Sequence, residues 1–393
     1  MQFPVSRYLC GFFLSTAGSA MCPIALSFGL IHAGKGAGAI GVVLFATIAP
    51  AVLLAPVAGA AADRLGRRRV MISADLARGA AELVFVSALW SGHMPATFAF
   101  VLLATILGLG QAFFFPASAG FLRMIAGDRL RQAIAWQASL RALARIGGPA
   151  IAGLLVQAGS TDLVLLVDGL GFVANAILLL TTATNVVQSS PTQRLGHSAL
   201  REAFSVTSRS RWLAGVFAFE GFFHMCVYAP CMALGPVIAA RFGNGSTAWG
   251  LISSLEGVGA ILGGVAISRI KFTQPLRAAF AFAALAAIMP LALATEDWLP
   301  PIMAAAFVGG IGLVSYDVLK DTFVQGRVDA SVVSSIAAFD IFVNSAAVAL
   351  GYLAAPAIAA LAGAEATLAA AAFLCVPLSL ALTRVRPRVV SQA

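Results

Sequence analysis

Long uninterrupted apolar runs are the feature of this sequence that most restricts its fold. They recur along all 393 residues, and a helix needs about 20 apolar residues to cross a bilayer. The runs are rich in Ala, Leu and Gly and lack the period-2 alternation of barrel strands. Only 10% of the residues are charged and the mean hydropathy is +0.94, so most of the surface must face lipid. The sequence therefore predicts an all-α polytopic membrane protein.

Twelve apolar segments can be drawn along the chain. They cover residues 8–32, 38–62, 70–90, 96–118, 132–157, 162–184, 212–240, 246–267, 275–294, 300–319, 330–357 and 364–383. One long polar connection, rich in Ser and Thr, divides them into two sets of six. We therefore expect an N-terminal six-helix bundle over 1–184, a central loop over 185–211 and a C-terminal six-helix bundle over 212–393.

The connections between the segments alternate in charge. One set carries Arg7, Arg64, Arg67, Arg68, Arg69, Arg123, Arg129, Arg131, Arg194, Arg201, Arg209, Arg211, Arg269, Lys271, Arg277, Lys320, Arg327, Arg384, Arg386 and Arg388. The other set carries only Lys35 and Arg241. Because Lys and Arg concentrate in cytoplasmic loops, this pattern predicts that both termini and the central loop are cytoplasmic. It also accounts for the pI near 10 without a nucleic-acid partner.

The two halves of the sequence resemble each other at corresponding positions. Gly108-Leu109-Gly110 in the fourth segment recurs as Gly310-Ile311-Gly312 in the tenth, and Phe121 and Phe323 match at the same offset. A parallel duplication of six spans leaves such correspondences. The pattern supports two related bundles.

The connection between the second and third segments carries the most specific motif, Gly59-Ala60-Ala61-Ala62-Asp63-Arg64-Leu65-Gly66-Arg67-Arg68-Arg69. It resembles the G-x-L-A-D-R-x-G-R-K signature of the major facilitator superfamily, with Ala61 where Leu is usual. The resemblance implies twelve transmembrane helices in two bundles, the major facilitator fold. It also implies a cytoplasmic gating motif made of Gly59, Asp63, Arg64, Gly66 and Arg67.

A second motif lies in the fifth segment, where Arg145 to Gly153 resembles the G-P-x-x-G-G signature of exporters. Gly148, Pro149 and Gly153 would form the exporter-type kink, although a Gly-Pro pair can also be a plain kink whose freed carbonyl is bonded by neighbours. The stretch that begins at Pro116 is similar to a bacterial subgroup that includes enterobactin exporters and macrolide efflux proteins. The resemblance implies export across the bacterial inner membrane.

Charged residues inside apolar segments are functional candidates, since each costs about 2.5–3.5 kcal/mol at the bilayer centre. At 1.5 Å per residue, Glu220, Glu256, Asp340 and Arg141 fall near the midplane. In the fold that the sequence resembles, their helices line or flank the cavity. The arginine that drug–proton antiporters of this superfamily carry in the fourth segment is absent, with Ala104 in its place. We therefore expect proton coupling through one or more of the three acids.

Two further residues share helix faces with these acids. His224 follows Glu220 by four residues and Asn344 follows Asp340 by four, so each pair lies on one face. A Glu–His pair could load and release a proton, or it could be a static hydrogen bond that fixes helix packing. Asn344 is the expected polar partner of Asp340.

Two arginines remain inside the fifth segment. Arg141 could meet an anionic substrate group or Glu220, whereas Arg145 is expected to form a structural pair with Asp168 in the sixth segment. These assignments place one arginine in the site and the other in the scaffold.

The features together predict a secondary transporter that works by alternating access. We expect export of a small amphiphilic molecule, such as an antibiotic or siderophore, in exchange for protons, by a monomer in the lipid bilayer. Import or facilitated diffusion of a small metabolite, and translocation of a lipid or lysolipid, stay open as alternatives. The sequence has no Walker-type loop and no metal-ligand spacing among its five cysteines. We therefore expect no cofactor, no metal and no enzymatic activity.

Overall fold

The computed structural model describes residues 3–92, 95–182, 197–329 and 332–383, and the regular elements within them are helices. The chain separates into two compact units. The first comprises Met1–Gly196 and Asn244–Gly250, and the second comprises His197–Gly243 and Leu251–Ala393. Each unit has its own buried apolar core.

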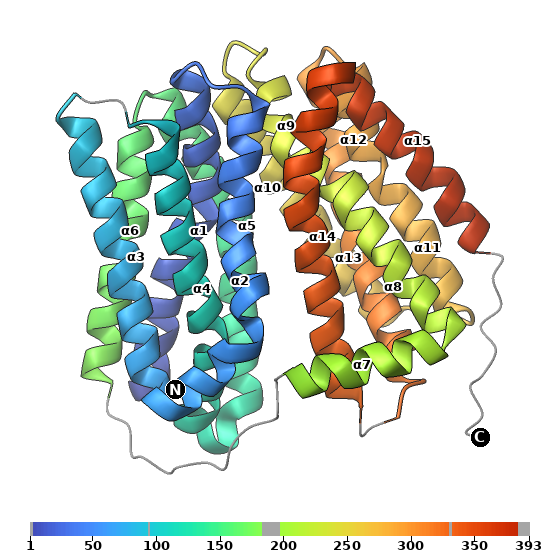
Figure 1. Cartoon of the computed structure of the whole chain (residues 1–393), viewed down its shortest axis with the longest axis horizontal. Helices are drawn as coiled ribbons and strands as arrows, with labels where there is room; N and C mark the ends of the chain where they lie inside the picture. The colour runs from blue at the N-terminus through green and yellow to red at the C-terminus, as the bar shows by residue number, and fades with distance from the viewer. Residues whose placement is uncertain (1–2, 93–94, 183–196, 330–331, 384–393) are drawn as a thin grey trace. The chain divides into compact units, whose positions relative to one another are not determined.

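The first unit is built from long helices drawn in blue to green in Figure 1. They are α1 (Phe3–His32), α2 (Ala37–Leu65), α3 (Arg67–Trp90), α4 (Thr97–Ala126), the 3₁₀ turn η1 (Gly127–Arg129), α5 (Leu130–Gln157) and α6 (Thr161–Thr181). Helix α1 packs against α5 and α6, α2 packs against α4, and α3 packs against α4 and α6. The contact of α1 and α3 with α6 encloses one of the two buried polar cores described below.

The second unit begins with α7 (His197–Arg209), which runs across the ends of α8 and α14 (Figure 1). The helices that follow are α8 (Arg211–Phe223), η2 (His224–Tyr228), α9 (Ala229–Ala239), α10 (Gly245–Arg269), α11 (Pro275–Ala286), α12 (Ile288–Thr295), α13 (Leu299–Gln325), α14 (Val333–Ala362) and α15 (Ala364–Leu382). Of the expected central connection 185–211, residues 185–196 lie outside the described residues and much of the remainder forms α7.

Prolines explain the two interruptions within apolar segments of the second unit. Pro230 has no N–H to donate, and just before it the backbone N–H of Ala229 bonds to the carbonyl of His224, five residues earlier. The turn η2 is therefore π-helical, and it joins α8 and α9 into one segment over Arg211–Ala239. Pro290 likewise removes a donor near the junction of α11 and α12.

Ten segments of the described residues are long and apolar enough to cross a membrane. Twelve were expected, and two features account for the difference. One of the ten, Thr97–Gln157, contains both α4 and α5. Helix α3 is not among the ten, because Arg67, Arg68 and Arg69 and the buried charges farther along lower its mean hydropathy.

Matching glycines in the two halves allow close helix contacts. A Cβ atom on Gly108 of α4 would lie 2.5 Å from the carbonyl oxygen of Thr47 on α2, and one on Gly310 of α13 would lie 2.0 Å from that of Glu256 on α10. Only glycine permits backbones to approach so closely. The repeated Gly-x-Gly thus serves the same packing purpose in each unit.

Candidate functional site

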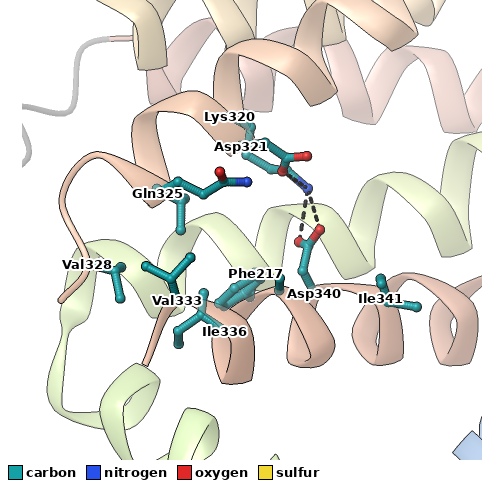
Figure 2. Close-up of a pocket in the computed structure, with 11 residues that line it drawn as sticks. Phe217, Lys320, Asp321, Gln325, Val328, Val333, Ile336, Asp340 and Ile341 are labelled. Carbon is teal, nitrogen blue, oxygen red and sulfur yellow. Dashed lines mark hydrogen bonds and ion pairs between the residues drawn. The ribbon is translucent and has the colours of Figure 1, made fainter. Parts of the chain in front are cut away.

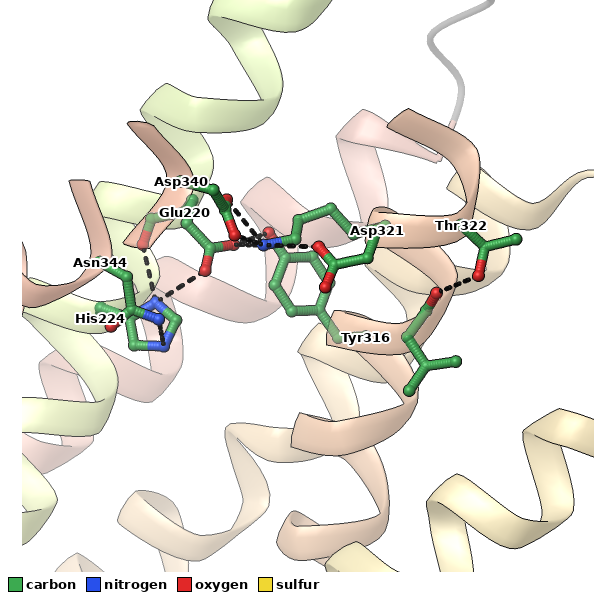
Figure 3. A network of polar contacts seen from close by, with 9 residues as sticks. Glu220, His224, Tyr316, Asp321, Thr322, Asp340 and Asn344 are labelled. Atoms are coloured by element: carbon green, nitrogen blue, oxygen red, sulfur yellow. Dashed lines mark hydrogen bonds and ion pairs between the residues drawn. The ribbon is translucent and has the colours of Figure 1, made fainter. Parts of the chain in front are cut away.

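A buried network of acids and bases lies in the second unit, between α8, η2, α13 and α14 (Figure 3). Glu220 of α8 is at its centre and is fully buried. Tyr316 donates a hydrogen bond of 2.6 Å from Oη to Glu220 Oε2, and Lys320 Nζ lies 3.2 Å from the same oxygen. Both partners come from α13 and are one helical turn apart. The predicted charged residue Glu220 therefore has a cationic partner within its own unit.

Lys320 joins Glu220 to a second acid. Its ammonium donates to both carboxylate oxygens of Asp340 on α14, at 2.9 and 3.0 Å, while Asp321 lies 3.4 Å away. Lys320 is 2% exposed, so its charge depends on these acids for compensation. A single buried cation thus holds α8, α13 and α14 together through two carboxylates.

His224 extends the network along the π-helical turn. Its Nδ1 lies 3.3 Å from Glu220 Oε1 and 3.1 Å from the Glu220 carbonyl oxygen. Nδ2 of Asn344 lies 3.1 Å from His224 Nε2. With the amide donating to Nε2, the imidazole proton resides on Nδ1 and is donated to the Glu220 carbonyl oxygen, with the carboxylate close by. Asn344 therefore contacts His224, whereas the sequence predicted it as the partner of Asp340.

Aromatic rings surround the acid–base network on the α8 side. The ring of Tyr316 lies 5.7 Å from that of Phe219, 5.8 Å from that of Phe223 and 6.5 Å from that of Phe280. Such a ring cluster excludes water and lowers the local dielectric constant. The attraction between Lys320 and its acids is stronger there than it would be at a surface.

A pocket of about 130 Å³ reaches the network from the end of the bundle near the α13–α14 connection (Figure 2). It is lined by Phe217, Lys320, Asp321, Val324, Gln325, Val328, Val333, Ile336, Ala337, Asp340 and Ile341. The side chain of Asp340 is 21% exposed and that of Glu220 is not exposed at all. The pocket therefore gives access to Asp340 and Lys320, while Glu220 stays enclosed behind them.

The remaining predicted midplane residues, Glu256 and Arg141, make other contacts. Glu256 of α10 lines a separate cavity of about 20 Å³ beside Tyr228 and Cys231. Arg141 of α5 is exposed, and its guanidinium carbon lies 5.5 Å from the ring centres of both Phe12 and Phe115. Both distances are in the range of cation–π contacts, and both rings belong to the first unit.

The expected structural pair of Arg145 and Asp168 is wrong. Arg145 is exposed on α5, whereas Asp168 is 1% exposed on α6. The carboxylate of Asp168 instead lies among Glu82 and Cys22, with one possible ligand atom from each within 4.8 Å of the others. An Asp this deeply buried cannot reach a side chain on the outside of another helix.

The predicted gating motif forms a tight corner between α2 and α3. Gly66 has φ of +89°, a conformation that favours glycine, and it separates the two helices. Arg67 donates from Nε and Nη2 to Asp63 Oδ1, at 3.1 and 2.9 Å. Arg64 is exposed, and a Cβ on Gly59 would meet open space, so neither joins this ion pair.

Two arginines of the same motif fasten this corner to the rest of the first unit. Arg67 packs on Gly120 of α4, where a Cβ would lie 2.5 Å from its guanidinium. Arg68 donates from Nε to the carbonyl of Leu179 at 2.8 Å, and from Nη2 to that of Leu180, at the end of α6. A cation at the C-terminus of a helix satisfies free carbonyls there.

The exporter-type residues of α5 allow close packing within the first unit. A Cβ on Gly148 would lie 2.7 Å from Cβ of Ala20 on α1, and the helix continues through Pro149 to Gln157. The carbonyl of Gly153 accepts a hydrogen bond of 3.1 Å from Ser246 Oγ at the start of α10, a segment that belongs to the first unit.

Lys320 and Tyr316 are the site residues that sequence reasoning missed. Lys320 was counted among the basic residues of the cytoplasmic connections, but α13 continues to Gln325 and buries it. A signal for the longer helix was present, because the helical spacing of Tyr316 and Leu319 continues through Lys320 and Phe323, beyond the expected end of the segment at 319.

Comparison with known proteins identifies the family. Residues 8–299 match the sequence profile described as the Major Facilitator Superfamily. Macrolide efflux protein A of Enterococcus faecalis is 28% identical over 220 residues, which are 55% of this chain and 68% of that protein. Macrolide efflux protein A of Streptococcus pyogenes is 26% identical over 251 residues, 63% of this chain and 62% of its length. The resemblance to macrolide efflux proteins is thus confirmed at low identity.

Solved structures confirm the fold. The nucleoside transporter NupG superposes with a TM-score of 0.80 at 13% identity, covering 97% of this chain and 98% of that one. A bacterial homologue of the iron transporter ferroportin superposes with a TM-score of 0.74 at 15% identity, covering 97% and 99%. The chain is a multi-pass membrane transporter and not an enzyme, and it belongs to the Major Facilitator Superfamily.

Proposed function

We propose that the protein exports a small amphiphilic molecule across the bacterial inner membrane in exchange for protons, by alternating access. The observation that carries the proposal is the Glu220–Lys320–Asp340 network, which lies beside a pocket of about 130 Å³. Ion networks buried at membrane depth are costly and mark ion or substrate pathways. We further propose that the protein acts as a monomer with both termini in the cytoplasm.

The geometry supports a partner exchange at Lys320. Asp340 makes the shortest contacts to Lys320 and lines the pocket, so a proton arriving there would weaken its bond to the Lys320 ammonium. Lys320 would then be held by Glu220, 3.2 Å away, and by the more exposed Asp321, 3.4 Å away. Because the three charged residues sit on α8, α13 and α14, this exchange changes how strongly α14 is tied to α13. Such a change is the two-state element that alternating access requires.

Two observations favour export over import. The relatives found in the sequence comparison include macrolide efflux proteins, and α5 carries the Gly148-Pro149 pair expected of exporters. They support a natural-product antibiotic such as a macrolide as the first substrate to test. The gating role of Asp63, Arg64 and Arg67 is proposed on the same footing, from the tight ion-paired corner at Gly66.

The test is transport into proteoliposomes that hold the purified protein, driven by an imposed pH gradient. Macrolides and siderophores are offered to the wild type, Glu220→Gln and Asp340→Asn, with Glu296→Gln as the exposed control. We expect at least one macrolide to accumulate against its gradient only while the pH gradient lasts, and both site variants to lose this accumulation. Equilibration of the compound regardless of pH would show a facilitator and would overturn the proposal.

A further inference from the structure

A second buried group of ionisable side chains lies in the first unit, between α1, α3 and α6. Glu82 of α3 is 0% exposed and Asp168 of α6 is 1% exposed. One carboxylate oxygen of each lies within 4.8 Å of the other and of Cys22 Sγ on α1. Two carboxylates this close cannot both stay ionised at low cost in an apolar core.

The carboxylate oxygens themselves point to a missing partner. Both oxygens of Asp168, and Oε2 of Glu82, have no hydrogen-bond partner in the described part of the chain. Buried polar atoms are almost always paired, and an unpaired buried carboxylate is among the costliest exceptions. A proton bound between the two acids would remove one negative charge and supply the missing donor.

The nearby cation is already engaged by a third acid. Arg78, one turn before Glu82 on α3, bonds from Nη2 to Asp75, and its guanidinium lies 4.1 Å from the Phe172 ring centre and 4.9 Å from that of Phe114 on α4. Asn175 of α6 donates to the other oxygen of Asp75 at 2.7 Å. The core thus holds three carboxylates and one arginine. The arginine bonds to Asp75, and its charge also reaches Glu82 and Asp168 without a hydrogen bond to either.

Helix α1 supplies the remaining wall of the site. Cys22 Sγ lies 3.8 Å from Glu82 Oε1, and a thiol is only a weak donor. A Cβ on Gly18 would lie 2.5 Å from Asp168 Oδ1, so the glycine makes room for the carboxylate. Ser19 donates to the backbone carbonyl of Ser15 at 2.9 Å. Neither side chain brings a positive charge to the pair.

We propose that Glu82 and Asp168 form a proton-binding site in the first unit, separate from the network around Glu220, and that they carry a proton that drives export. The proposal deepens the proposed function and rests on it for its link to transport. The contrast between the two cores supports it: Glu220 and Asp340 each contact the Lys320 ammonium, whereas the Glu82–Asp168 pair contacts a thiol. An acid beside a cation binds a proton more weakly than an acid without one. The Glu82–Asp168 pair should therefore hold its proton at a higher pH than the acids around Lys320.

The position of the pair connects it to the predicted gate. Asp75, Arg78 and Glu82 lie on one face of α3 at helical spacing, and this face leads from the pair toward the corner at Gly66. A change of charge at Glu82 and Asp168 acts on the packing of α3 against α6. Helix α3 begins directly after the corner that carries the Asp63–Arg67 ion pair.

The first experiment measures proton binding directly, without transport. Proton uptake by the purified full-length protein in detergent is titrated from alkaline to acidic pH, for the wild type, Glu82→Gln, Asp168→Asn and the exposed control Glu296→Gln. At pH above about 6, an exposed Glu stays ionised, so the control should take up as many protons as the wild type. In that range we expect Glu82→Gln and Asp168→Asn each to take up about one proton fewer, and infrared difference spectra to lose a protonated-carboxyl band. Unchanged proton uptake in both variants would overturn the proposal.

The second experiment separates proton coupling from structural support. Exchange of a labelled macrolide across proteoliposomes without a pH gradient is compared with accumulation driven by a gradient. We expect both variants to retain at least half of the exchange and to lose accumulation by tenfold or more. If accumulation survives in both variants while it stays proton-driven in the wild type, the inference fails and the proposed function stands. If the wild type ignores the pH gradient while the proton count still depends on both acids, the proposed function fails and the binding site stands.

A measurement of metal content tests whether the site binds a metal ion instead of a proton. Cys22, Glu82 and Asp168 are all residue types that bind divalent metals, so the purified protein is analysed for bound metal before and after chelation. We expect less than a tenth of an ion per chain. One tightly held ion per chain that disappears in Cys22→Ser would make this a metal site and would overturn the proposal.

Discussion

Replacing Lys320 with methionine removes the only charge that faces both acids of the second unit's described network. Methionine has a similar length and an unbranched apolar chain, so packing changes little. Glu220 then loses its cation at 3.2 Å, and Asp340 loses two hydrogen bonds, of 2.9 and 3.0 Å. Glu220 is fully buried and keeps only the Tyr316 hydroxyl and His224 as polar neighbours among the described contacts.

The size of the effect follows from burial. Removing one partner of a buried ion pair costs about 3–5 kcal/mol, because the other charge is left uncompensated. Asp340 is 21% exposed toward the pocket and can be solvated there, so most of the loss comes from Glu220. A loss of 1 kcal/mol lowers the melting temperature by about 2–4 °C for a unit of this size. Lys320→Met should therefore lower it on the order of 10 °C.

The assay is thermal unfolding of the purified protein in detergent, with a matched set of variants. Lys35→Met removes an exposed lysine and should shift the melting temperature by less than about 2 °C, since surface changes are usually small. The double variant Lys320→Met/Glu220→Gln removes the buried charge that was left behind and should recover more than half of the loss. A melting temperature for Lys320→Met equal to that of Lys35→Met would refute the reasoning. A double variant less stable than Lys320→Met would also refute it.

Three further predictions concern single contacts. Tyr316→Phe removes a hydrogen bond to a buried carboxylate and should lower the free energy of unfolding by about 1.5–3 kcal/mol in the same unfolding assay. Full stability in this variant would contradict the role given to the hydroxyl. Gly310→Val places a side chain 2.0 Å from a backbone carbonyl and should abolish folded protein in size-exclusion chromatography, whereas Gly215→Val, where nothing lies within 4 Å, should not. Asp63→Asn breaks a partly exposed ion pair, so it should cost less than about 1 kcal/mol of stability while it removes most of the transport rate. A large loss of stability with normal transport would instead show that the motif is structural.

The membrane fold could be predicted because its main cause is local in sequence. An apolar segment must satisfy its backbone hydrogen bonds within itself, which makes each run a helix whatever its neighbours are. The prolines near η2 and at the junction of α11 and α12 were not used to predict interruptions, yet the segments 212–240 and 275–294 agree closely with Arg211–Ala239 and Pro275–Thr295. The family motif at Gly59–Arg69 then supplied the arrangement that hydropathy alone cannot give.

The site could be predicted only in part because its pairings join distant positions. The pairing of His224 with Glu220 follows from helical spacing, and the structure shows that contact. Lys320 is 100 residues away from Glu220 along the chain, and nothing local to Lys320 indicates that two acids neutralise it. Its charge instead suggested the end of an apolar segment, so the expected span stopped at 319 while α13 runs to Gln325.

Asp168 is a second residue whose partner the sequence could not predict. A carboxylate in one segment and an arginine in the preceding one suggested an ion pair, but helix rotation decides which face a residue occupies, and apolar periodicity is weak where lipid and core are both apolar. The structure turns Asp168 inward toward Glu82 and leaves Arg145 exposed. The sequence placed Asp168 within the sixth segment and could not identify its neighbour.

The two polar cores differ in the charge that balances their acids, and under both proposals this difference would give each a distinct place in the transport cycle. In the second unit, an ammonium contacts both Glu220 and Asp340, so protonation of one acid would shift Lys320 toward the other and change the helix contacts. In the first unit, Glu82 and Asp168 have orphaned oxygens and lie next to a thiol, so a change of protonation alters net charge without a compensating movement of a cation. Under these proposals, the core around Lys320 responds to a proton by rearranging its contacts, and the Glu82–Asp168 core holds the proton. If both proposals hold, Asp340→Asn should still bind the proton of the first unit while failing to transport, and Asp168→Asn should leave the stability contributed by Lys320 intact.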